Sequence, residues 1–164
     1  MSGRFRLFPI AIIVAAGLSV PAHAQSELFE GFEQASLAQK QEAAAFKECC
    51  ATSVYVDHYD CGCVAQLFLK ARIGLGDEVA PSSVEIAMQG PDLLACVDPE
   101  RAYQTGVASC QIGGVMVFRG PPPEAYCDCF GNKYAAVVQT DLEAGISRRG
   151  RERNATRAYD ACRE

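Results

Sequence analysis

The chain has 164 residues, a formal net charge of −5 and nine cysteines. The stretch 1–24 holds two of the 15 basic residues and none of the 20 acidic residues, so the stretch 25–164 carries a formal charge of −7. That length predicts one compact domain. The acidic balance argues against a nucleic-acid binder.

The beginning of the chain, up to Ala24, has the three parts of a secretory signal. Arg4 and Arg6 give a basic start, residues 10–20 form an apolar core, and Ala22-His23-Ala24 is a small-x-small cleavage site. We expect cleavage near Ala24 and a periplasmic or secreted mature chain. No later stretch is apolar enough and long enough to span a membrane, and export makes disulfides the default state of the cysteines.

Helical periodicity dominates the rest of the chain and predicts an all-α fold of about six helices. We expect one helix over 26–50 and a connecting loop over 51–59. Asp60 is a candidate N-cap for a helix over 61–73, which Gly74-Leu75-Gly76 ends.

The middle of the chain contains further helix signals. Ser82 and Glu85 have the spacing of a capping box that begins a helix, and Gly90-Pro91 interrupts that segment. Asp98-Pro99 is typical of an N-cap followed by proline at the first helical position. The helix that begins there is expected to run toward Cys110.

The last third is predicted to contain two more helices. Residues 115–118 stand between a Gly-Gly pair and a proline run, which favours a short strand or a buried extended loop. A helix over 124–139 should bury Phe130, Tyr134 and Val138 on one face. The final helix is expected over 149–162.

Two copies of one cysteine spacing organise the chain. Cys61-Gly62-Cys63 is followed by Cys96, and Cys127-Asp128-Cys129 is followed by Cys162. The interval from Cys63 to Cys96 equals the interval from Cys129 to Cys162. We interpret residues 25–164 as a single helical domain built from two diverged C…CxC…C units, over about 43–97 and 103–163.

Helix geometry predicts how each C-x-C pair is used. Two cysteines separated by one residue point about 200° apart on a helix, so one should bridge backward and the other forward. The backward partner is Cys49 or Cys50 in the first unit and Cys110 in the second; which member of each pair faces which side stays open. The disulfide candidates are Cys49, Cys50, Cys61, Cys63, Cys96, Cys110, Cys127, Cys129 and Cys162.

Nine cysteines cannot all pair within one chain. The surplus lies at Cys49-Cys50, because a bridge between neighbours in sequence is strained. We therefore expect one of these two to be a free thiol or to link two chains as a disulfide-bonded dimer.

An alternative interpretation assigns chemistry to the first unit. Cys49, Cys50, His58, Cys61 and Cys63 offer thiolate and imidazole groups that suit copper or zinc, or thiols for disulfide exchange. The leading interpretation requires no cofactor, because export favours oxidation of the thiols. No thioredoxin-like βαβ pattern surrounds either C-x-C.

A basic cluster stands out in the acidic chain. Arg148, Arg149, Arg151 and Arg153 are a candidate anion-binding site for a lipid headgroup or an acidic partner; the alternative is a solvated helix face. No Ser-His-Asp set, paired-carboxylate motif or phosphate loop is present in the sequence. The sequence thus favours a role other than catalysis and leaves an enzymatic one open.

Two short resemblances accompany these patterns. The stretch Tyr59-Asp60-Cys61-Gly62-Cys63 and its counterpart over 126–130 resemble small exported bacterial helical proteins, mostly uncharacterised, that carry C…YCxC–helix…C; that resemblance implies no activity. The series Cys49-Cys50, Cys61-x-Cys63, Cys96, Cys110 is similar to part of the pattern of plant lipid-transfer proteins, helical domains that enclose an acyl chain. This chain lacks two upstream cysteines of that family and adds a second C-x-C unit.

We therefore predict an exported, disulfide-stabilised helical protein with a binding or structural role; its partner is unidentified, and another protein is one candidate. The first alternative is a metal-binding or thiol-redox protein. The second alternative is a carrier of an apolar ligand.

Overall fold

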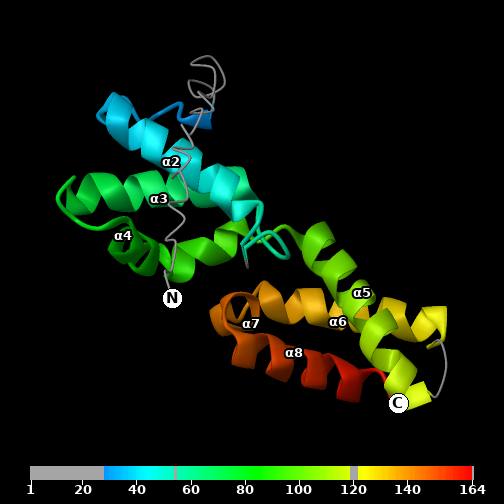
Figure 1. Cartoon of the computed structure of the whole chain (residues 1–164). Helices are drawn as coiled ribbons and strands as arrows, with labels where there is room; N and C mark the ends of the chain where they lie inside the picture. Colours follow the sequence, from blue (N-terminus) through cyan, green and yellow to red (C-terminus); the bar gives the residue numbers. More distant parts are fainter. Residues whose placement is uncertain (1–27, 54, 119–121, 164) are drawn as a thin grey trace, which may run out of the picture.

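The computed structural model describes residues 28–53, 55–118 and 122–163, and helices joined by turns and loops make up these ranges (Figure 1). The all-α prediction is confirmed there, since no strand is present and a single isolated bridge joins Tyr59 to Val97. The predicted signal, residues 1–24, lies outside the described residues. The elements are α2 (Leu37–Cys50), α3 (Cys61–Leu75), α4 (Pro81–Met88), η1 (Pro91–Cys96), α5 (Pro99–Phe118), α6 (Glu124–Val138), α7 (Leu142–Ile146) and α8 (Arg148–Ala161).

Two clusters of buried residues divide these helices into two halves. The first half packs α2, α3, α4 and η1 around aromatic and aliphatic side chains such as Phe68, Leu69 and Leu93. The second packs α5 to α8 around Phe130, Tyr134 and Val138, the three residues that helical spacing placed on one face. The two halves lie side by side in Figure 1.

A short backbone pairing lies where the chain passes from the first half to the second. The Asp60 N–H donates to the Cys96 carbonyl and the Asp98 N–H donates to the His58 carbonyl, both at 2.9 Å. The side chain of His58 then reaches into the second half and contacts Tyr134. The halves are thus connected by this side-chain bond as well as by the covalent link.

The first helix begins later than its periodicity suggests. Residues 29–35 form turns, and α2 starts after Ser36, so the prediction of one helix over 26–50 is wrong in its first third. Ser36 Oγ accepts from the Gln39 N–H at 3.2 Å, and the Gln39 side chain accepts from the Ser36 N–H at 3.0 Å. This capping box satisfies two backbone donors, which is why the helix begins there.

Two further boundaries differ from the predictions. The proposed capping box of Ser82 and Glu85 does not form, because Pro81 occupies the first turn and Ala80 is the N-cap, with no side-chain cap. Residues 115–118 are neither a strand nor an extended loop, because α5 continues through them to Phe118. The Asp60 cap is confirmed, with Asp60 Oδ1 accepting from the Cys63 N–H at 2.7 Å.

The second half depends on close backbone packing at glycines. A Cβ added to Gly106 on α5 would lie 2.9 Å from the Gly131 Cα on α6, so these helices cross with almost no side chain between them. A Cβ on Gly150 would overlap the carbonyl of Glu143, so α8 begins directly against α7. The sequence did not predict α7, a separate short helix before the final one.

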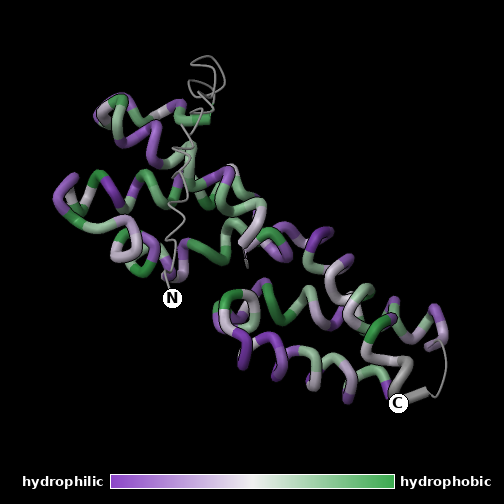
Figure 2. Tube along the Cα trace, in the orientation of Figure 1, coloured by the Kyte–Doolittle hydropathy of each residue, from purple (hydrophilic) through white to green (hydrophobic). Residues whose placement is uncertain are grey.

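Among the described helices, none is long and apolar enough to cross a membrane. Figure 2 shows instead that hydrophilic residues run along much of α8.

Candidate functional site

Four disulfides crosslink the helices, two in each half. In each C-x-C pair the first cysteine bridges backward and the second bridges forward, a choice that the sequence left open. The two forward bridges have the equal separation of 33 residues that the spacing predicts. The bridges are Cys50–Cys61, Cys63–Cys96, Cys110–Cys127 and Cys129–Cys162.

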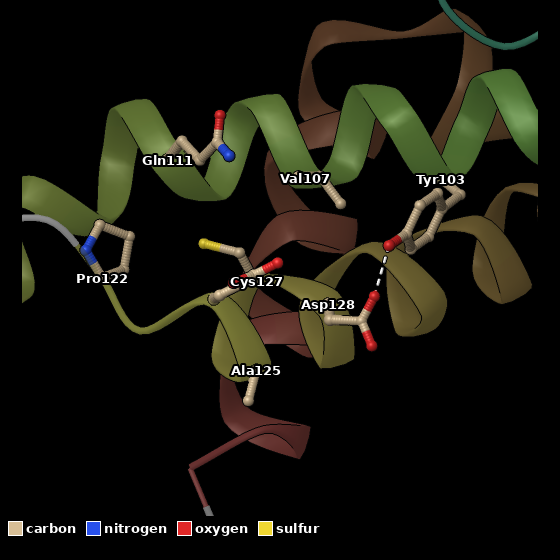
Figure 3. Close-up of a pocket in the computed structure, with 8 residues that line it drawn as sticks. Tyr103, Val107, Gln111, Pro122, Ala125, Cys127 and Asp128 are labelled. Atoms are coloured by element: carbon tan, nitrogen blue, oxygen red, sulfur yellow. Dashed lines mark hydrogen bonds between the residues drawn. The ribbon is translucent and has the colours of Figure 1, made fainter.

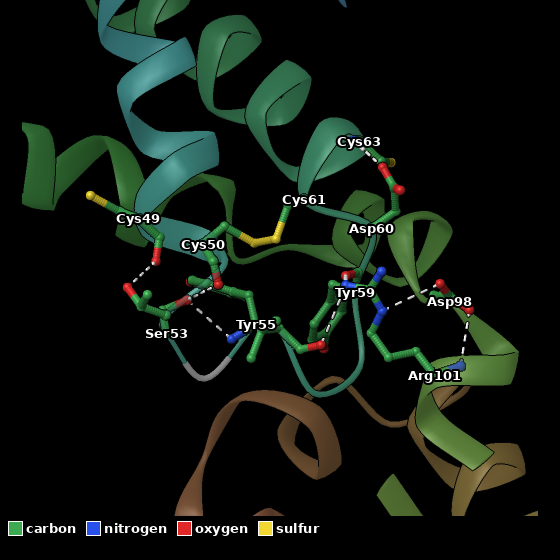
Figure 4. The surroundings of a disulfide bond; sticks show 12 residues. Cys49, Cys50, Ser53, Tyr55, Tyr59, Asp60, Cys61, Cys63, Asp98 and Arg101 are labelled. Carbon is green, nitrogen blue, oxygen red and sulfur yellow. Dashed lines mark hydrogen bonds and ion pairs between the residues drawn. A yellow bond between two sulfur atoms is a disulfide. The ribbon is translucent and has the colours of Figure 1, made fainter. Parts of the chain in front are cut away.

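The end of α2 decides which of the neighbouring cysteines pairs. Cys50 is buried and faces the start of α3, where Cys61 lies, whereas Cys49 is exposed. Figure 4 shows the Cys49 sulfur pointing away from the Cys50–Cys61 bridge. Among the described residues Cys49 is the one cysteine outside a disulfide.

We expect mild alkylation of the native, non-reduced protein to label Cys49 and no other cysteine. An exposed thiol is accessible to the reagent, whereas cysteines in disulfides have no thiol to react. Peptide mapping after iodoacetamide treatment measures the label, and Cys49→Ser provides the control. Label on Cys50 or Cys61 would contradict this assignment.

Most residues of the metal and thiol-redox hypothesis are engaged in other bonds in this oxidised structure. Cys50, Cys61 and Cys63 are in disulfides, and the His58 imidazole lies 3.0 Å from the Tyr134 hydroxyl, with which it shares a hydrogen bond. A copper or zinc site at these positions therefore requires reduction of two bridges. Among the described residues, no group of three or more His, Cys, Asp or Glu side chains is arranged to hold a metal ion.

His58 is fully buried between the two halves. Its ring stacks on Tyr134 at 5.6 Å between centroids, and its Nδ1 finds no hydrogen-bond partner within the described part of the chain. Burial lowers the pKa of His58 to about 4, against a weaker opposing effect of the nearby Asp57 carboxylate. The imidazole is therefore neutral at physiological pH, as a buried and singly bonded ring requires.

The predicted basic cluster lies on α8, and its arginines point in different directions. Arg148 forms an exposed ion pair with Glu152 at 2.9 Å. Arg151 is half-buried, and its guanidinium donates to the Gly145 carbonyl at 3.5 Å. These two arginines are engaged in contacts within the second half.

Arg149 and Arg153 are exposed, and the described residues provide neither with an ion-pair partner. Arg157 continues the same row one turn later and contacts Asp141 at 3.5 Å. These residues are four apart and therefore lie on one face of the helix. We call Arg149, Arg153 and Arg157 the arginine face. Sequence reasoning missed Arg157, although its spacing of four from Arg153 would have indicated it.

An apolar pocket of about 360 Å³ opens beside the arginine face, between α5, α6 and α8. Phe130, Tyr126 and Tyr159 supply aromatic walls, with the two tyrosine rings edge to face at 6.1 Å between centroids. No single helix carries this lining, so periodicity alone could not reveal it.

A second hollow, of about 850 Å³, lies between α5 and α6 (Figure 3). There the Tyr103 hydroxyl donates to the carboxylate of Asp128, the central residue of the second C-x-C. That bond raises the pKa of Tyr103. The tyrosine and the aspartate thus satisfy each other, and the hollow is less suited than the α8 region to attract a charged ligand.

Comparisons with known proteins give no family for this chain. No family model, no curated protein and no solved structure matches it. Function must therefore be argued from the site itself.

Proposed function

We propose that this chain is an exported, disulfide-stabilised binding protein that docks on anionic lipid headgroups through the arginine face of α8. The observation that carries the proposal is the exposure of Arg149 and Arg153 without an ion-pair partner among the described residues. Guanidinium groups bind phosphate and carboxylate oxygens in bidentate geometry. Two such groups one turn apart offer an anionic surface several donors at once.

The distribution of charge along the chain supports docking with α8 facing the lipid surface. Residues 28–97 carry four basic and ten acidic side chains, whereas α8 carries five arginines and two acidic residues. An anionic surface would attract α8 and repel the first half. The molecule would therefore approach with α8 foremost.

Crosslinking and the order of elements support the rest of the proposal. Four disulfides are compatible with an extracellular or periplasmic protein. Each half also runs in the same order: a helix with the backward cysteine, the C-x-C helix, a short helix, and an element that ends at or just before the forward cysteine. We infer that the halves are a diverged duplication.

Replacing Arg149 and Arg153 with glutamine should weaken binding to anionic vesicles by about 30-fold. Each basic residue near such a surface contributes about 1 kcal/mol, and a loss of about 2 kcal/mol corresponds to that factor. Co-sedimentation with vesicles of phosphatidylglycerol and phosphatidylcholine, against pure phosphatidylcholine, measures the effect.

The matched control is Lys40→Gln with Lys47→Gln, which removes the same two charges from α2. This variant should bind the anionic vesicles within threefold of the wild type, and added salt should weaken binding of both. Equal losses in the arginine and lysine variants would show that net charge, and not the arginine face, governs the interaction. Absence of wild-type binding would refute the proposal.

A further inference from the structure

The apolar pocket and the arginine face meet on α8. Thr156 lines the pocket, and it also lines the shallow hollow formed by Arg149, Glu152, Arg153 and Arg157. The Glu152 carboxylate in this hollow is paired with Arg148 at 2.9 Å, so its charge is offset. Going around the helix from Thr156, Ala155 and Tyr159 turn toward the pocket while the arginines turn toward the hollow. A ligand that crosses α8 at Thr156 would contact both.

The pocket has the character of a site for an alkyl chain. Its volume of about 360 Å³ falls within the range of small-ligand sites. Gly113 and Gly114 of α5 contribute no side chain to its wall, and a Cβ on Gly113 would meet nothing within 4 Å. Phe130 of α6 and Tyr159 of α8 add aromatic side chains to the lining. Ser109 and Thr156, which also line the pocket, are exposed residues.

Charge complementarity identifies the other end of the ligand. Arg149 and Arg153 lie on the surface next to the pocket, and the Arg163 guanidinium lies 5.3 Å from the Tyr159 ring centroid near the end of α8. A cation-rich rim beside an apolar pocket suits a molecule with an anionic head and an alkyl chain. An uncharged apolar molecule would leave the rim unused, and a small anion would leave the pocket unused.

We propose that this site takes up one molecule of a single-chain anionic lipid, a fatty acid, with its carboxylate on the arginine face and its alkyl chain in the pocket between α5, α6 and α8. The inference rests on the proposed function, because the same arginines bind the head. It adds that a lipid monomer, and not only the membrane surface, is the ligand. Burial of the chain contributes affinity in proportion to its length.

Isothermal titration calorimetry with sodium dodecanoate below its micelle concentration tests the site. We expect one molecule bound per chain, with octanoate about 200-fold weaker, because each buried methylene changes affinity about fourfold. Dodecanol, which keeps the chain and lacks the charge, should bind about tenfold more weakly than dodecanoate. Equal affinities for octanoate and dodecanoate would overturn the proposal.

Gly113→Leu should reduce dodecanoate affinity at least tenfold by filling the pocket. Leucine also forms helix more readily than glycine, so the variant should keep its fold, which thermal melting verifies. Gly74→Leu is the control: Gly74 is an exposed helical glycine in α3 with nothing within 4 Å of a Cβ, and it lies in the other half. Unchanged dodecanoate binding by Gly113→Leu would refute the pocket assignment.

Vesicle binding separates this inference from the proposed function. Gly113→Leu should lose dodecanoate yet retain binding to phosphatidylglycerol vesicles, because the arginine face is intact. If wild-type protein binds vesicles but not dodecanoate, the monomer site is wrong and the docking role survives. If it binds dodecanoate but not vesicles, docking at the membrane surface is wrong and the pocket assignment survives.

Discussion

Replacing Cys63 and Cys96 together with alanine should lower the free energy of unfolding by about 3–4 kcal/mol. Their bridge spans 33 residues, and removing it restores the conformational entropy of that loop to the unfolded chain. Alanine avoids placing an unpaired hydroxyl at the buried Cys96 position. Urea denaturation of the oxidised protein, followed by circular dichroism, measures the loss.

The free energy of unfolding that each disulfide contributes should increase with the length of the loop it closes. The Cys129–Cys162 bridge also spans 33 residues and should cost as much as Cys63–Cys96, whereas Cys110–Cys127 spans 17 and Cys50–Cys61 spans 11. In the chain-entropy model the shortest loop contributes about 1 kcal/mol less than the longest. Cys49→Ala is the matched control and should change stability little, because its side chain is exposed and unbridged. A largest cost at the shortest loop would contradict the entropic account.

Acidification should destabilise the wild-type protein through His58. The pKa of His58 falls from its ordinary value of 6.5 to about 4 on folding, chiefly because burial disfavours the charged ring. Between these values the unfolded chain binds more protons than the folded one. Above pH 6.5 the titration of His58 does not lower the free energy of unfolding. As pH falls from 6.5 toward 4, that free energy decreases by about 3 kcal/mol through this residue.

His58→Phe removes the titrating group and keeps a ring stacked on Tyr134. Its free energy of unfolding should fall less than that of the wild type between pH 7.5 and 4, with a difference of about 3 kcal/mol. The phenylalanine variant starts less stable because the Tyr134 hydroxyl loses its partner. This constant difference in stability does not affect how steeply the free energy of unfolding of each protein changes with pH. Parallel curves for the two proteins would show that His58 titrates normally in the folded state.

The repeated cysteine spacing determined much of this fold in advance. Helical periodicity and the two equal C-x-C to cysteine intervals predicted an all-α chain in which disulfides join each C-x-C helix to a preceding and a following element. These features depend on neighbours in sequence and on the geometry of one helix. Local caps such as Asp60 were read correctly for the same reason, and the missed box at Ser36 and Gln39 was equally local.

The tertiary structure alone decided how cysteines, histidine and arginines are used. Whether Cys49 or Cys50 pairs depends on which side of α2 faces α3, and the burial of His58 depends on a tyrosine 76 residues away. The pocket likewise needs three helices that meet only after folding. Spacing along one helix fixes the directions in which side chains point, but what they meet there is set by long-range packing, which no local pattern encodes.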